Sequence, residues 1–172
     1  MFAKTLILGI VAFVLSGCGP FWVDPYITVE DSSLNWVHIH YYNLKSSPIR
    51  RISVYLSGTG YVKVLKGTSE QVSNDFAKNH EAENWHDVEN SEQYVDVKHL
   101  NALFQDLVNR GLLDREKLFK RTKKKNMSRF LGVKANINNR TYSENDNIFE
   151  VDPNLAEALF DVVCQFNNPI KK

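Results

Sequence analysis

The sequence is poor in the features that usually carry catalysis or covalent cross-linking. It contains 2 cysteines in 172 residues, which excludes a disulfide-rich scaffold. It has no Gly-x-Ser-x-Gly turn, no phosphate-binding glycine loop, no His-Glu-x-x-His and no Cys-x-x-Cys pair. An active site can still be assembled in space, but the sequence names no catalytic residue and indicates no cofactor.

An excess of charge is also missing. The chain has 21 basic and 20 acidic residues and a formal net charge of +1, and a balanced chain of this kind is not a general polyanion binder. We therefore expect no nucleic-acid partner. Glycine and proline are scarce while 12% of the residues are aromatic, which argues against a disordered chain.

The apolar run near the amino terminus is too short to cross a membrane. It extends from Leu6 to Leu15, much less than the roughly 20 residues that span a bilayer. It follows the single charge of Lys4 and precedes small residues, the order typical of a secretory signal peptide. We therefore interpret residues 1–17 as a cleaved signal peptide.

The end of this run, Leu15-Ser16-Gly17-Cys18, resembles the lipobox of bacterial lipoproteins. The resemblance implies cleavage before Cys18 and acylation of that cysteine, by palmitate or similar chains, as the mature amino terminus. The alternative is an ordinary secreted protein that is cut at the same place and keeps Cys18 as a plain thiol. Gly19, in place of Asp, implies the outer membrane if the cell is Gram-negative.

The next residues, 18–33, contain two prolines and no sustained period, so we interpret them as a tether ahead of a single domain at 34–172. From Leu34 the pattern alternates, which is the period of a strand. Two further alternating runs flank Ser57-Gly58-Thr59-Gly60 and predict a hairpin. The acidic stretch 68–95 predicts an exposed loop, with room for a short helix at 73–79 and a strand near Tyr94.

The second half predicts two helices and another hairpin. Asp96 is placed as an N-cap and Gly111 as a C-terminal cap of one helix, and Asp152-Pro153 opens the last helix. Alternation over 131–137 and the pair Asn138-Asn139 predict two strands joined by a tight turn. The fold class is therefore α+β: an antiparallel β-sheet of four to six strands with two main α-helices on one face. It loosely resembles domains of small bacterial lipoproteins, a likeness that carries no activity.

One face of the predicted sheet is rich in large amphipathic rings. If the Val and Ile side chains face the helices, six rings share the outer face: Trp36, His38, His40, Tyr42, Tyr55 and Tyr61. Such a cluster suits a protein partner or a glycan. In the alternative reading, the tether or the 68–95 loop covers it.

His38-Ile39-His40 is the histidine pair with ligand-like spacing, because both rings of such a pair project from one face of a strand. A metal site also needs a third ligand, from His80, His86, His99 or the carboxylates around Trp85. The pair alone lacks a closed ligand set, so we assign no metal. An envelope enzyme or metal-dependent binder that uses His38, His40 and the acidic loop is our alternative function.

Two further features have simple interpretations. The stretch from Arg115 to Arg129 contains eight Lys or Arg residues; it could meet anionic lipid or a phosphate-bearing polymer, but a solvated loop is the simpler interpretation. Cys164 lies away from the main apolar stripe of the last helix, next to Phe160, and we expect it to pack beneath the carboxyl-terminal tail. If it is exposed instead, an unpaired thiol in an oxidising compartment invites an intermolecular bond.

These inferences combine into one expectation. The chain should be a lipoprotein of the cell envelope, held in the membrane by its amino-terminal lipid. Its domain should be a non-enzymatic binding or scaffolding module, with another envelope protein or a cell-wall polymer as its partner.

Overall fold

The computed structural model describes residues 27–72, 85–114, 128–144 and 146–167. Several sequence-based predictions fall outside the described residues: the predicted signal peptide 1–17, the lipobox-like stretch with Cys18, the helix considered at 73–79 and most of the basic stretch. The described elements, in chain order, are β1 (Trp36–Asn43), β2 (Ile49–Ser57), β3 (Tyr61–Ser69), β4 (His86–Tyr94), α3 (Val97–Asn109), β5 (Arg129–Ile137), β6 (Arg140–Glu144), α4 (Ile148–Val151) and α5 (Pro153–Asn167).

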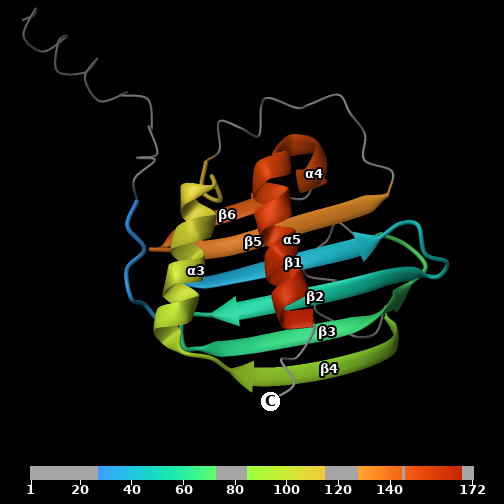
Figure 1. Cartoon of the computed structure of the whole chain (residues 1–172), viewed down its shortest axis with the longest axis horizontal. Coiled ribbons are helices and arrows are strands. Elements are labelled where there is room, and N and C mark those ends of the chain that lie inside the picture. Colours follow the sequence, from blue (N-terminus) through green and yellow to red (C-terminus); the bar gives the residue numbers. More distant parts are fainter. Residues whose placement is uncertain (1–26, 73–84, 115–127, 145, 168–172) are drawn as a thin grey trace, which may run out of the picture.

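The predicted α+β architecture is confirmed. Six antiparallel strands form one sheet in the order β4-β3-β2-β1-β5-β6. Helices α3 and α5 lie across the same face of this sheet (Figure 1). No helix in the described ranges is long and apolar enough to cross a membrane.

Strand β1 lies in the middle of the sheet and follows the predicted alternation. It pairs with β2 on one side and with β5 on the other. Val37, Ile39 and Tyr41 belong to the core cluster shared with the helices. Because successive strand residues point to opposite faces, His38 and His40 must lie on the outer face, away from the helices.

Both predicted hairpins are present. Strands β2 and β3 pair in register from Ile49 with Ser69 to Leu56 with Val62, so the glycine-rich tetrad is a turn and not a phosphate loop. Asn138 and Asn139 have φ values of 50° and 60°, the left-handed conformation that asparagine tolerates in a tight hairpin turn.

The predicted helix caps are confirmed as well. The Asp96 side chain accepts a hydrogen bond from Lys98 N at 2.8 Å, and Asp152 accepts one from Leu155 N at 3.2 Å. At the end of α3, Gly111 has φ 101°. Gly111 N donates to Val108 O at 2.9 Å and Leu112 N to Leu107 O at 3.0 Å, which are the two bonds of a Schellman motif.

The strand predicted near Tyr94 is present but is longer than expected: β4 begins at His86 and pairs with β3 as an edge strand. The exposed loop predicted for most of 68–95 is therefore wrong over residues 86–94. All nine residues of β4 are exposed, so no apolar alternation marks the strand in the sequence. The backbone pairing with β3 creates it instead. Acidic residues on an exposed edge strand also discourage pairing with other chains.

The predicted tether is too long, because its second half is part of the folded domain. Ile27 is buried and Val29 packs against the core. Val29 N donates to Gln105 Oε1 at 2.7 Å, and Gln105 Nε2 donates to Ile27 O at 3.0 Å. Further on, the backbone at Ser32 lies so close to Gly58 that a Cβ there would meet Ser32 O at 2.0 Å.

Replacing Gln105 by alanine tests this attachment. We expect Gln105→Ala to destabilise the domain by about 1 kcal/mol, because two bonds to the 27–29 backbone are lost, and to speed hydrogen exchange at the Val29 amide. Gln165→Ala, in an exposed position on α5 where the side chain meets His99, is the matched control. Equal unfolding midpoints in urea and an unchanged Val29 amide would contradict the attachment.

Candidate functional site

The outer face of the sheet carries side chains in rows that the strand register defines. His38 of β1 is opposite Tyr55 of β2, which is opposite Lys63 of β3 and then Glu92 of β4. The adjacent row contains His40, Ser53, Leu65 and Asn90. The register therefore brings together residues of four strands that no local motif links.

The six rings predicted to share this face differ in their exposure. His38, His40 and Tyr42 are 3%, 1% and 0% exposed, so they form the floor of the face and not its surface. Trp36, Tyr55 and Tyr61 are half-buried. A partner could therefore reach the second group directly, while the first group supports it from below.

The two histidines of the predicted pair contact each other on this floor. Their ring centroids are 4.2 Å apart. His38 Nε2 is 2.7 Å from Ser53 Oγ in a buried hydrogen bond, and the His38 ring meets the edge of Tyr55 at 5.8 Å between centroids. These contacts fix the His38 ring in one orientation, with Tyr55 on one side and Ser53 on another.

A buried cation closes the end of the face beyond His40. Arg51 is 1% exposed, and its guanidinium carbon lies 3.8 Å from the centroid of the Trp85 ring and 5.1 Å from that of Tyr42. Burial lowers the pKa of Arg51 to about 10, although Tyr42 opposes this shift. Trp85 belongs to the 68–95 segment, so that segment covers this part of the face, as in the alternative reading above.

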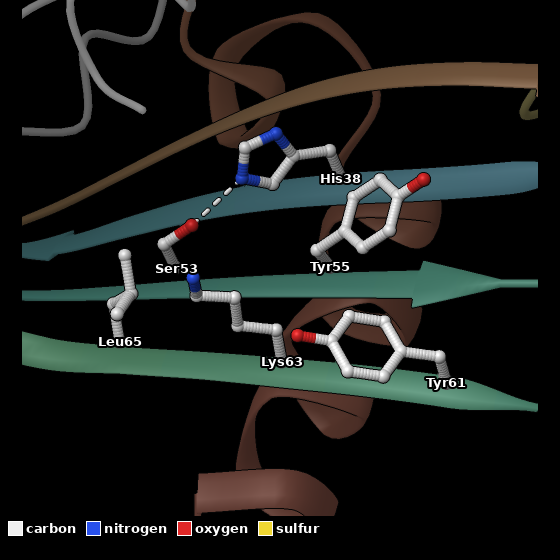
Figure 2. Close-up of a pocket in the computed structure, with 6 residues that line it drawn as sticks. All are labelled: His38, Ser53, Tyr55, Tyr61, Lys63 and Leu65. Carbon is white, nitrogen blue, oxygen red and sulfur yellow. Dashed lines mark hydrogen bonds between the residues drawn. The ribbon is translucent and has the colours of Figure 1, made fainter. Parts of the chain in front are cut away.

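A pocket of about 330 Å³ opens on the same face beside this closed part. It is lined by His38, Ser53, Tyr55, Tyr61, Lys63 and Leu65, and Figure 2 shows these side chains together on one side of the strands. The hydrogen-bonded pair of His38 and Ser53 supplies its buried polar part. Most of the remaining lining is aromatic or aliphatic, and Lys63 is the one cation in it.

The rim of the pocket next to β4 is a small polar network. Lys63 Nζ lies 3.7 Å from Glu92 Oε1, and Asn90 Nδ2 donates to the same oxygen at 3.3 Å. Hydrogen bonds from Asn90 and Tyr61, together with the charge of Lys63, lower the pKa of Glu92. Burial first, and then Glu92, raise the pKa of Tyr61, and burial raises that of Tyr55, so both phenols are neutral at pH 7.

Among the described residues, neither His86 nor His99 joins the pair formed by His38 and His40. His86 begins β4 and is exposed, while His99 is on α3, on the other side of the sheet, beside Gln165. Within the described ranges, no group of three or more His, Cys, Asp or Glu side chains could hold a metal ion. His80 lies outside these ranges, so the metal-dependent reading stays a prediction.

The structure describes the surroundings of Arg129 in the basic stretch and of Cys164. Arg129, the last residue of the basic stretch, bonds Glu157 at 2.8 Å and lies over Phe149 at 4.2 Å, so it is held by the helical layer. Cys164 is exposed, and the expectation that it is packed is wrong because the apolar stripe of α5 faces the sheet and Cys164 lies outside that stripe. Partial burial, Asp161 and Glu157 raise the pKa of its thiol.

Four residues of this face were not predicted from the sequence: Arg51, Ser53, Lys63 and Leu65. The sequence does contain a signal for these residues, because each lies an even number of positions from Tyr55 or Tyr61 on the same strand and so points to the same face of the sheet. Once the hairpin register is known, these positions must share the outer face. The alternation along a strand predicts the face on which Arg51 lies, but it does not predict that Trp85 buries it.

Comparisons with known proteins add no assignment. No protein-family model matches the chain, and no curated protein matches it.

Truncating Trp85 tests the closed end of the face. We expect Trp85→Ala to lower the free energy of unfolding by about 3–5 kcal/mol, as for other buried tryptophans, because the change also uncovers the buried Arg51 cation. Trp85→Phe, which keeps an aromatic ring over Arg51, should lose much less. The half-buried Trp36→Ala is the control in denaturant titrations. If Trp85→Ala costs no more than Trp36→Ala, the proposed cover of Arg51 is wrong.

Proposed function

We propose that this protein is a lipid-anchored component of the bacterial cell envelope whose domain binds a saccharide of the cell wall or cell surface in the outer-face pocket. The observation that carries the proposal is the pocket itself, where two tyrosines stand beside a buried His38–Ser53 pair and one lysine. Small-molecule sites are typically concave and mainly apolar, with a few polar groups that orient the ligand.

The side chains that line the pocket suit a sugar ring better than the flat surface of a protein partner. Aromatic rings present an apolar face, and sugar rings have one too, while hydroxyl and imidazole groups can exchange hydrogen bonds with sugar hydroxyls. The volume of about 330 Å³ is at the lower end of small-molecule sites, which begin at about 300 Å³. A protein partner would instead need a contact area of about 800 Å² on each side.

The lipid anchor rests on the lipobox resemblance at Leu15 to Cys18. If Cys18 is acylated, the chain from there to Ile27 spans at most about 30 Å when fully extended, at about 3.3 Å per residue. The pocket would then stay within a few nanometres of the membrane.

The alternative function, an envelope enzyme, has one observation in its favour. His38 Nε2 and Ser53 Oγ are within hydrogen-bond distance at 2.7 Å, as a base and a nucleophilic serine must be. We rank it below binding because the backbone N–H groups of the paired strands serve the sheet ladder. An oxyanion hole usually needs such groups to be available.

The anchor is tested by replacing each cysteine in turn. We expect Cys18→Ser to abolish fatty-acid labelling and to release the protein from the membrane fraction, whereas Cys164→Ser should leave both unchanged. Metabolic labelling with an alkyne fatty acid, followed by fractionation of the producing cells, measures both. Unchanged labelling of the Cys18→Ser protein would show that the protein is not anchored by a lipid on Cys18.

The pocket is tested by comparing two tyrosines of the same face. We expect Tyr55→Ala to weaken binding of solubilised wall polysaccharide by about fivefold to tenfold, because one aromatic contact is worth about 0.5–1.5 kcal/mol beyond its buried area. Tyr94→Ala should have a smaller effect, since Tyr94 is 79% exposed and meets the pocket only through the Tyr61 ring, at 5.6 Å between centroids. Isothermal titration of the two variants decides; equal losses would contradict a site in this pocket.

A further inference from the structure

We infer that the ligand of the outer-face pocket is an acidic sugar, a ring that carries one carboxylate or phosphate, and that Lys63 binds this anion in exchange for Glu92. The inference rests on the proposed function and names the ligand class for the same pocket. Three observations support it: the position of Lys63 in the pocket lining, its weak contact with Glu92, and the buried polar groups nearby.

The lining offers a place for a single negative charge. Of the six described residues that line the pocket, Lys63 is the one that is charged. Tyr55 is the direct neighbour of Lys63 on β2, and Tyr61 is on the same strand as Lys63. In Figure 2 the Lys63 ammonium points away from both tyrosine rings and toward the Ser53 end of the pocket, so a sugar ring that packs against Tyr55 would meet Lys63 Nζ with a substituent on its Ser53 side.

The present partner of Lys63 is easy to replace. The distance of 3.7 Å to Glu92 is long for a charge-assisted hydrogen bond, and the two side chains are 39% and 48% exposed. Exposed ion pairs of this kind contribute little to stability. Glu92 also accepts a hydrogen bond from Asn90 Nδ2, so its carboxylate keeps a partner when Lys63 turns toward a ligand.

The buried part of the pocket can hold the rest of the ring. Ser53 and His38 are 4% and 3% exposed, and their hydrogen bond fixes both groups in position. A hydroxyl of a bound sugar could use the remaining lone pair of Ser53 Oγ. The pocket thus combines an anion contact at its rim with a hydroxyl contact at its base, the pattern that an acidic sugar presents.

The test measures binding of four simple sugars to the full-length protein in detergent, by chemical shifts in nuclear magnetic resonance spectra. We expect glucuronic acid and glucose 6-phosphate to bind more tightly than glucose, and glucosamine to bind most weakly. Lys63→Met should weaken binding of the two acidic sugars by about fivefold, the upper range for an exposed ion pair, and leave glucose unchanged. Glu92→Gln should strengthen it by about twofold, because it frees Lys63.

Matched variants separate this effect from general changes. Lys134→Met removes another cation of the same face, opposite His38 on β5 and outside the pocket lining, and should have no effect. Lys63→Arg should retain most of the affinity for the acidic sugars. Because Glu92→Gln is expected to act in the opposite direction to Lys63→Met, a general loss of folding cannot imitate the pattern.

The outcomes that overturn the inference are distinct from those that overturn the proposed function. If glucose binds as tightly as glucuronic acid and Lys63→Met changes neither, the acidic-sugar inference is wrong and the saccharide site stands. If glucosamine binds most tightly, Glu92 and not Lys63 recognises the ligand, and the inference is again wrong. If inorganic phosphate alone shifts the same residues as strongly as glucose 6-phosphate, the pocket recognises an anion and not a sugar. If neither the sugars nor wall polysaccharide binds, the proposed function fails as well.

Discussion

The pairing of β1 on both of its edges is the constraint from which the rest of this structure follows. Every residue from Val37 to Tyr42 is buried, so this strand has no solvated face. The residues that face the helices are apolar and form the core, as in any two-layer α+β domain. Those on the other face include two histidines: His38 shares a hydrogen bond with Ser53, and the His40 ring packs against His38. The outer face is therefore a layer of specific contacts between polar and aromatic side chains.

That layer changes in character along the sheet. At one end, Trp85 and Tyr42 enclose Arg51, an arrangement that keeps a cation out of water and gives the sheet a cover from its own chain. At the other end the cover stops, and Tyr55, Tyr61 and Lys63 line an open pocket. The His38–Ser53 pair lies between the two. The alternation that places apolar side chains in the core thus also places polar and aromatic side chains together in the outer-face pocket.

Much of the fold could be predicted from the sequence because its signals are local. The caps at Asp96, Gly111 and Asp152 each act within one helical turn, and the alternation of β1 to β3 is read along one strand at a time. The missed features depend on distant residues. Only the end of β4 near Tyr94 was predicted, because the rest of this strand forms only where β3 offers an edge, and residues 27–29 are ordered by Gln105, far along the chain. The pocket needs the register of three strands, so its aromatic residues could be predicted from the sequence but Ser53 and Lys63 could not.

The central claim is that the uncovered part of the outer face is a ligand site, and mapping the bound surface tests it most directly. Isotope-labelled protein would be titrated with solubilised wall polysaccharide, and the amide shifts followed across the sheet. We expect the largest shifts on β2 and β3 around Ser53, Tyr55 and Lys63, and on His38 of β1. Shifts confined to α3 and α5, or to the exposed edges at β4 and β6, with the pocket residues unchanged, would contradict it.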